Sequence, residues 1–190
     1  MDSHCDNEEV HQYLATQTGP EALDRSLADA MFRSDNLLGA CLMAGLSGSA
    51  RERLARAGIL NTVNAVPADG LGLQNVAPLD LLTAYAALAT QQRAVLPRFS
   101  VRDASAVAGP LMTPMAAQMT YSLLQGVVHQ GTAWRAASVL SDDYALAGKT
   151  GTAGKGRELV FVGFARDLVA LLWVGVVSGK GAVSQHHASD

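Results

Sequence analysis

A short motif near the C-terminal end of the chain, Lys149-Thr150-Gly151-Thr152, combines residue types that can bind a carboxylate. Lys149 supplies positive potential, and Thr150 and Thr152 can donate hydrogen bonds to carboxylate oxygens. Gly151 would let a ligand backbone approach without a Cβ in the way. Backbone N–H groups of the same segment can stabilise the oxyanion of an acyl transfer. The motif therefore predicts a site for a ligand that carries a carboxylate next to a reactive acyl group.

A second polar motif, Ser34-Asp35-Asn36, lies far upstream. Alone it is weak, because such a triplet often forms a turn or a helix N-cap. Combined with a strand that carries Lys149, it predicts a site in which Ser34 passes protons between lysine and a leaving amine. In the same site, Asn36 would hold the substrate amide. We expect catalytic roles for Ser34, Asn36 and Lys149, and substrate binding by Thr150, Gly151 and Thr152.

The chain contains no serine placed for activation by a lysine. A nucleophilic serine of this kind needs its lysine one helical turn away to accept the proton, which gives the spacing S-x-x-K. The three lysines of the chain are preceded three positions earlier by Leu146, Thr152 and Val177. Thr152 gives the spacing T-x-x-K, but Gly154 disfavours a helical turn there. We therefore expect the chain to be inactive alone.

Helical periodicity dominates the chain up to about residue 140. Apolar spacing predicts helices from Pro20 to Ser34 and from Asp35 or Asn36 to Leu46, so that the S-D-N motif lies at a helix junction. A short basic helix at 51–57, a loop at 61–75 and a helix from Pro78 follow, and Ser47 is expected at a helix boundary. Residues 93–110 indicate a mixed segment with a short strand pair. Thr113-Pro114 predicts the start of a further helix that ends at Gly131-Thr132.

After Tyr144 the period changes to that of extended chain. Residues 144–152, 159–165 and 168–177 predict three consecutive strands joined by tight turns. The expected fold class is α+β, with a helical region followed by a three-stranded antiparallel meander. We expect a polar leader at 1–18, a domain at 19–178 and a flexible tail at 179–190.

Composition excludes several classes of function. The net charge of −3 without a basic run argues against nucleic acid and anionic lipid as partners. The longest apolar run, 168–177, is too short to span a membrane, and the polar N-terminus gives no export signal. The five histidines show no metal-binding spacing, so we expect no metal and no cofactor. Cys5 and Cys41 could pair in an oxidising compartment, but cysteines in such positions more often stay unpaired.

Several segments beyond the two motifs resemble the bifunctional, class A penicillin-binding proteins. The run 23–36 resembles the helix that leads to S-x-N in that family, and 71–86 resembles its G-x-x-x-V-x-P-L helix start. The segment 124–132 resembles its L-x-x-V-V-x-x-G-T element. The motif at 147–153, followed by Phe161-Val-Gly-Phe-Ala165 and Trp173-Val-Gly175, resembles its final strands. The similarity covers roughly residues 19 to 178.

This resemblance implies a partial fold of the β-lactamase/transpeptidase type. It implies a serine D,D-transpeptidase that cross-links peptidoglycan stem peptides and binds β-lactams in the periplasm or cell envelope. The S-x-x-K segment of the family and two strands of its five-stranded sheet have no counterpart in the chain. We therefore expect an open sheet face that favours self-association or a partner chain.

Two other functions compete with this interpretation. A non-catalytic module derived from a penicillin-binding protein could use the carboxylate-binding strand, or the open edge of the sheet, to bind a peptide or a protein. A relative of class A β-lactamases would share the S-D-N motif. Against it, the segments around Val76 and Val127 are more similar to transpeptidases.

Overall fold

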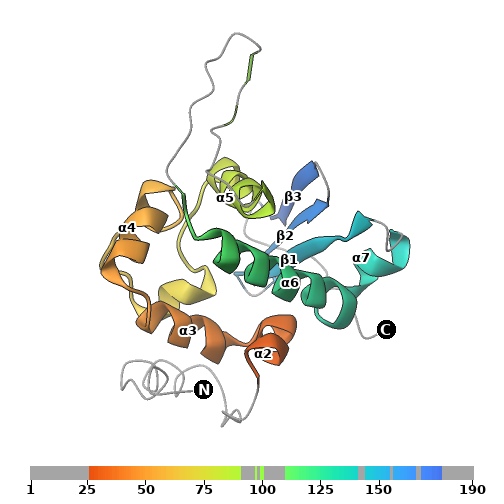
Figure 1. Cartoon of the computed structure of the whole chain (residues 1–190), viewed down its shortest axis with the longest axis horizontal. Coiled ribbons are helices and arrows are strands. Elements are labelled where there is room, and N and C mark those ends of the chain that lie inside the picture. The colour runs from red at the N-terminus through yellow and green to blue at the C-terminus, as the bar shows by residue number, and fades with distance from the viewer. Residues whose placement is uncertain are drawn as a thin grey trace. The chain divides into compact units, whose positions relative to one another are not determined.

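The structure, a computed structural model of the chain, describes residues 26–90, 97, 99–100, 110–140, 144–154, 156–165 and 168–176 (Figure 1). The chain divides into two compact units, Met1–Ala77 and Pro78–Asp190. The predicted leader, the predicted tail and most of the mixed segment at 93–110 lie outside the described residues. Within the described part, no helix is both long and apolar enough to cross a bilayer.

In the described residues 26–77, the first unit has three short α-helices and one 3-10 helix, which are α2 (Leu27–Arg33), α3 (Asn36–Ala44), α4 (Gly48–Arg56) and η1 (Pro67–Leu71). Ser26, Asp35 and Ser47 cap the N-termini of the three α-helices through their side-chain oxygens. The helix predicted from Asp35 or Asn36 and the boundary at Ser47 are confirmed. The loop predicted at 61–75 is wrong in its middle, where Pro67 begins η1.

Helix α3 and η1 approach each other closely enough that both need glycine at the contact. A Cβ on Gly39 would lie 2.7 Å from the carbonyl oxygen of Gly70. Arg51 ties the end of α3 to the loop before η1, because its guanidinium donates to Met43 O at 2.9 Å and to Ala65 O at 2.8 Å. These contacts hold α3 in place, and the S-D-N motif lies at the N-terminus of this helix.

Among the described residues of the first unit, α3 contributes to both buried apolar clusters. Leu37, Ala40 and Cys41 form one buried cluster, and Met43 packs with residues from the following loop in another. Cys41 is disulfide-bonded, so the expectation of unpaired cysteines is wrong for this residue. The only other cysteine of the sequence, Cys5, lies outside the described residues.

The described segments of the second unit form three helices and one antiparallel sheet. The helices are α5 (Pro78–Thr90), α6 (Pro114–Gln130) and α7 (Trp134–Val139), and the strands are β1 (Ala147–Ala153), β2 (Glu158–Ala165) and β3 (Leu168–Gly175). The strand order β1-β2-β3 confirms the predicted meander. Thr113 caps α6 by accepting a hydrogen bond from Ala116 N at 3.2 Å, as predicted. Helix α7, whose six residues do not complete two turns, was not predicted.

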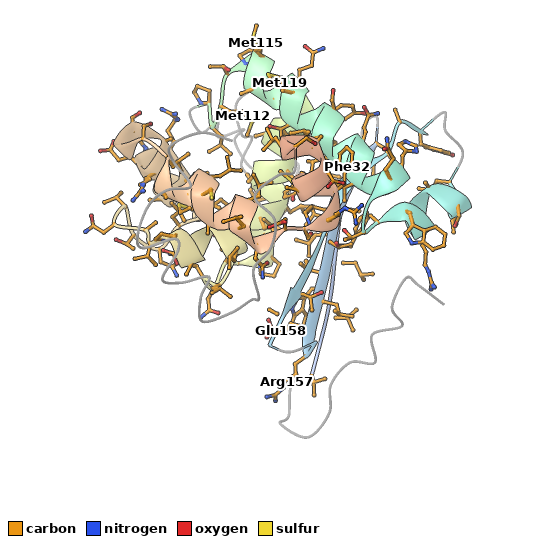
Figure 2. All side chains as sticks on the ribbon, turned by 90° about the horizontal axis from the view of Figure 1, so that it is seen from below. Phe32, Met112, Met115, Met119, Arg157 and Glu158 are labelled. Atoms are coloured by element: carbon orange, nitrogen blue, oxygen red, sulfur yellow. The ribbon has the colours of Figure 1, made fainter. Side chains whose placement is uncertain are left out.

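The two faces of the sheet have different surroundings. Helices α5 and α6 lie over one face of the sheet (Figure 1). Val162 and Phe164 are buried on this face, and the rings of Tyr85 and Tyr121 contact the Phe164 ring. On the opposite face, Leu168 and Leu172 are 68% and 63% exposed. The predicted open apolar face is therefore confirmed among the described residues. The hairpin turn between β1 and β2, marked by Arg157 and Glu158, lies at the end of the sheet that points away from α6 (Figure 2).

Candidate functional site

The K-T-G-T motif forms the middle of β1, the terminal strand of the sheet. Lys149 pairs with Val162 of β2, whereas Thr150 pairs with Phe161 and Thr152 pairs with Leu159. Because successive side chains of a strand point to opposite faces, Lys149 lies on the helix-covered face and both threonines lie on the open face. A single carboxylate can therefore meet all three side chains only along the free edge of β1, the edge that pairs with no described strand.

Lys149 is half-buried beside α6, and its ammonium donates to the carbonyl oxygen of Thr150 at 3.1 Å. Burial in these surroundings lowers the pKa of Lys149 below its ordinary value, because it removes water from the charged form. A lysine of this kind gives up its proton more easily than a solvated one. That property suits proton exchange with a neighbouring hydroxyl.

Thr150 has a partner that sequence reasoning missed as a site residue. The hydroxyl oxygens of Thr150 and Thr132 lie 2.6 Å apart, within hydrogen-bond distance. Thr132 follows the last residues of α6, so the end of this helix contacts the K-T-G-T strand directly. The signal was present in the sequence, because Thr132 closes the G-T element of the segment 124–132.

Gly151 is required by the sheet itself. A Cβ at this position would lie 2.7 Å from Cγ1 of Val160, its partner on β2. The sequence predicts that Gly151 admits a ligand backbone. The close approach to Val160 gives a separate, structural reason for glycine at this position. A side chain here would push β1 away from β2 and move both Lys149 and Thr150.

The S-D-N motif forms the junction between α2 and α3. Ser34 is the C-cap of α2 in the left-handed conformation, with φ 57° and ψ 46°. Asp35 caps α3 by accepting a hydrogen bond from Leu37 N at 2.9 Å. Ser34 and the first helical residue, Asn36, are both exposed. The S-D-N motif therefore lies where one helix ends and the next begins, as predicted.

The residues of the predicted site are distributed over the two units. Ser34 and Asn36 belong to the first unit, and the K-T-G-T strand belongs to the second. The structure brings together Lys149, Thr150 and Thr132, and the joint action of Ser34 with Lys149 stays a prediction. Across the described segments, no group of three or more histidine, cysteine or acidic side chains could hold a metal ion.

Comparison with known families gives one match over most of the chain. The family model of the penicillin-binding protein transpeptidase domain matches residues 49–189. The match includes residues 78–189 of the second unit and all of the K-T-G-T strand.

Individual relatives match this chain over only a small part of their own length. Penicillin-binding protein 1A of Neisseria meningitidis serogroup B is 28% identical over 169 residues, which cover 79% of this chain and 21% of the relative. Penicillin-binding protein 1A of Clostridium novyi is 33% identical over 79 residues, or 42% of this chain and 9% of the relative. The chain thus spans about a fifth or less of these relatives.

Solved structures share the fold. Penicillin-binding protein 1A of Haemophilus influenzae matches with a TM-score of 0.70 at 18% identity, over 84% of this chain and 31% of that one. The D,D-transpeptidase domain of a peptidoglycan glycosyltransferase from Eggerthella lenta matches with a TM-score of 0.55 at 18% identity, over 73% of this chain and 45% of that one. Both structures support an α+β fold of the transpeptidase type.

Proposed function

Because the chain belongs to the penicillin-binding protein transpeptidase domain family, as a partial domain of the class A type, we propose that its K-T-G-T strand binds the carboxylate of a peptidoglycan stem peptide or a β-lactam. The binding is reversible in this proposal, and the chain alone forms no acyl-enzyme. The work of the domain would take place in the cell envelope.

The observation that carries this proposal is the position of the motif on the terminal strand of the sheet. Lys149 and the two threonines emerge on opposite faces of β1, so a ligand lying along the free edge can meet the cation from one side and the hydroxyls from the other. A charge-assisted hydrogen bond from Lys149 would supply most of the affinity for the carboxylate. Thr150 and Thr152 would fix its orientation.

We expect no catalytic activity from the chain alone, because no hydroxyl residue stands one helical turn before a lysine. Thr152 stands three positions before a lysine, but it lies in β1, and Gly154 follows it in a turn with φ 59°. An extended segment cannot bring a hydroxyl and a lysine amine together as one helical turn does. In this proposal, Ser34 and Asn36 serve the reaction only when an S-x-x-K segment is supplied.

A second candidate function is a non-catalytic protein-binding module. Leu168, Leu172 and Val174 expose apolar area on the open face of β3. A contiguous exposed apolar surface of this kind favours association with another chain or a second copy. Association through β3 would leave β1 free, so the two functions can be measured separately.

The test combines intact-mass measurement after exposure to a penicillin with titration of a peptide ending in D-Ala-D-Ala. We expect an unchanged mass and saturable binding of the peptide. Lys149→Gln should weaken this binding by about 10-fold or more, since a hydrogen bond to a charged group contributes about 1.5–3 kcal/mol. Arg157→Gln is the matched control, because it removes a cation from the exposed hairpin turn of the same sheet.

Three results would contradict the proposal. Equal affinity in the Lys149→Gln and Arg157→Gln variants would show that the ligand does not use the K-T-G-T strand. Covalent addition of the penicillin would show that a nucleophile outside the S-x-x-K pattern is active in this chain. Association without any peptide affinity would favour the protein-binding module.

A further inference from the structure

Helix α6 is tied to the K-T-G-T strand at two levels. At the entrance to the strand, Tyr121 Oη donates to the carbonyl oxygen of Ala145 at 2.6 Å. In the middle of the strand, the hydroxyls of Thr132 and Thr150 lie 2.6 Å apart. Gln125, one turn after Tyr121 on α6, also donates to the Ala145 carbonyl oxygen, at 3.5 Å.

The two ties are present together in the observed register of the strand. Tyr121 of α6 bonds the residue Ala145 before β1, and Thr132, just after α6, bonds Thr150 in the middle of β1. A slip of β1 by one residue would move these positions by about 3.3 Å along α6 and break both hydrogen bonds. Helix α6 thus helps to fix where the Thr150 side chain lies.

The hydroxyl pair also has a donor requirement. A threonine hydroxyl has one proton and two acceptor positions, so only one of the two threonines can donate within the pair. If Thr150 donated to Thr132, it would have no proton left for a carboxylate. If Thr132 donates, Thr150 keeps its own proton for the ligand.

We propose that Thr132 is a positioning residue of this site, which acts by fixing the rotamer of Thr150 and by donating to its hydroxyl oxygen. The Thr150 proton then points away from α6, where a ligand carboxylate can accept it. The inference rests on the proposed function and adds one residue to the site, although the geometry of the pair can be tested without any ligand.

The ligand-free test measures the three-bond couplings of the Thr150 γ-methyl carbon by NMR in the full chain. We expect couplings of a single rotamer in the wild type and in Thr132→Ser, which keeps the hydroxyl. Thr132→Val should give averaged couplings. Thr120→Val is the control, because the Thr120 hydroxyl donates to Ala116 O within α6 and its loss should leave Thr150 unchanged. Single-rotamer couplings in Thr132→Val would overturn the proposal.

The second test measures peptide affinity in the same variants. Thr132→Val should weaken binding by about 3- to 10-fold, the range for loss of one hydrogen bond, and Thr132→Ser should stay within about 2-fold of the wild type. In a Thr150→Val background, Thr132→Val should have no further effect. A persisting effect there would show that Thr132 acts by another route, which overturns the proposal. A wild-type chain that binds no peptide would refute the proposed function, and the NMR couplings would still decide the role of Thr132.

Discussion

Replacement of Gly39 by alanine tests the close approach of α3 to η1. An ideal Cβ at Gly39 would lie 2.7 Å from the carbonyl oxygen of Gly70 and 2.9 Å from Cδ2 of Leu71. The leucine can rotate, but the Gly70 carbonyl belongs to the backbone of η1 and cannot. Helix α3 and η1 must therefore separate by several tenths of an ångström to accept the methyl group.

The magnitude follows from two opposing effects. Alanine is favoured over glycine inside a helix by about 0.8–1 kcal/mol. Overpacking a filled contact costs about 1–3 kcal/mol, and a backbone neighbour places this case at the upper end. We expect Gly39→Ala to lower the free energy of unfolding by about 1–2 kcal/mol, which corresponds to about 2–8 °C in Tm for a chain of this size.

The assay is urea unfolding of the full chain, followed by far-ultraviolet circular dichroism. Gly48→Ala is the matched control, because Gly48 begins α4 and a Cβ there would have no other heavy atom within 4 Å. It should raise stability by up to about 1 kcal/mol through helix propensity alone. A Gly39→Ala chain as stable as the wild type would refute the close approach. An equal loss in Gly48→Ala would show that the effect is not specific to Gly39.

Three further predictions concern the two units separately. Ser34→Gly should be at least as stable as the wild type, because glycine adopts the left-handed conformation without strain. Ser34→Val should lower the free energy of unfolding in urea by about 1 kcal/mol. The reverse order of stability would contradict a positive φ at this position. Arg51→Lys should lower the free energy of unfolding by about 1–3 kcal/mol in the same assay, since an ammonium cannot reproduce the guanidinium contacts to Met43 O and Ala65 O. An unchanged free energy of unfolding would show that these hydrogen bonds add no stability. Burial lowers the pKa of Lys149 in the folded chain below the ordinary lysine value of 10.5. Between these two pKa values the unfolded chain binds more protons than the folded chain, so stability rises with pH. Lys149→Met should remove this contribution, and an unchanged slope of Tm against pH in the variant would contradict the effect of burial.

Local signals in the sequence predicted most of the secondary structure. Thr113-Pro114 predicted the start of α6 because capping and a fixed φ are properties of the residues themselves. The change of period after Tyr144 predicted the three strands for a similar reason. Helix α7 and η1 were missed because each is too short for helical periodicity to show.

The site was predicted in its residue types and only partly in its contacts. The K-T-G-T strand and the S-D-N junction could be recognised from residue order and neighbouring caps. The bond between Thr132 and Thr150 joins residues 18 positions apart, and the contact between Gly39 and Gly70 joins residues farther apart still. Both depend on how helices and strands pack, and neither leaves a period in the sequence.

Because Ser34 has a left-handed conformation, selection for stability and selection for activity should favour different residues at this position. Among the twenty amino acids, glycine fits the backbone at φ 57° with the least strain. A library of variants sorted for resistance to proteolysis should therefore become enriched in glycine at this position. A library sorted for ligand turnover, with the missing nucleophile segment supplied, should instead retain serine. The difference between the two enrichments would measure how much folding stability is given up at this position to keep a hydroxyl group there.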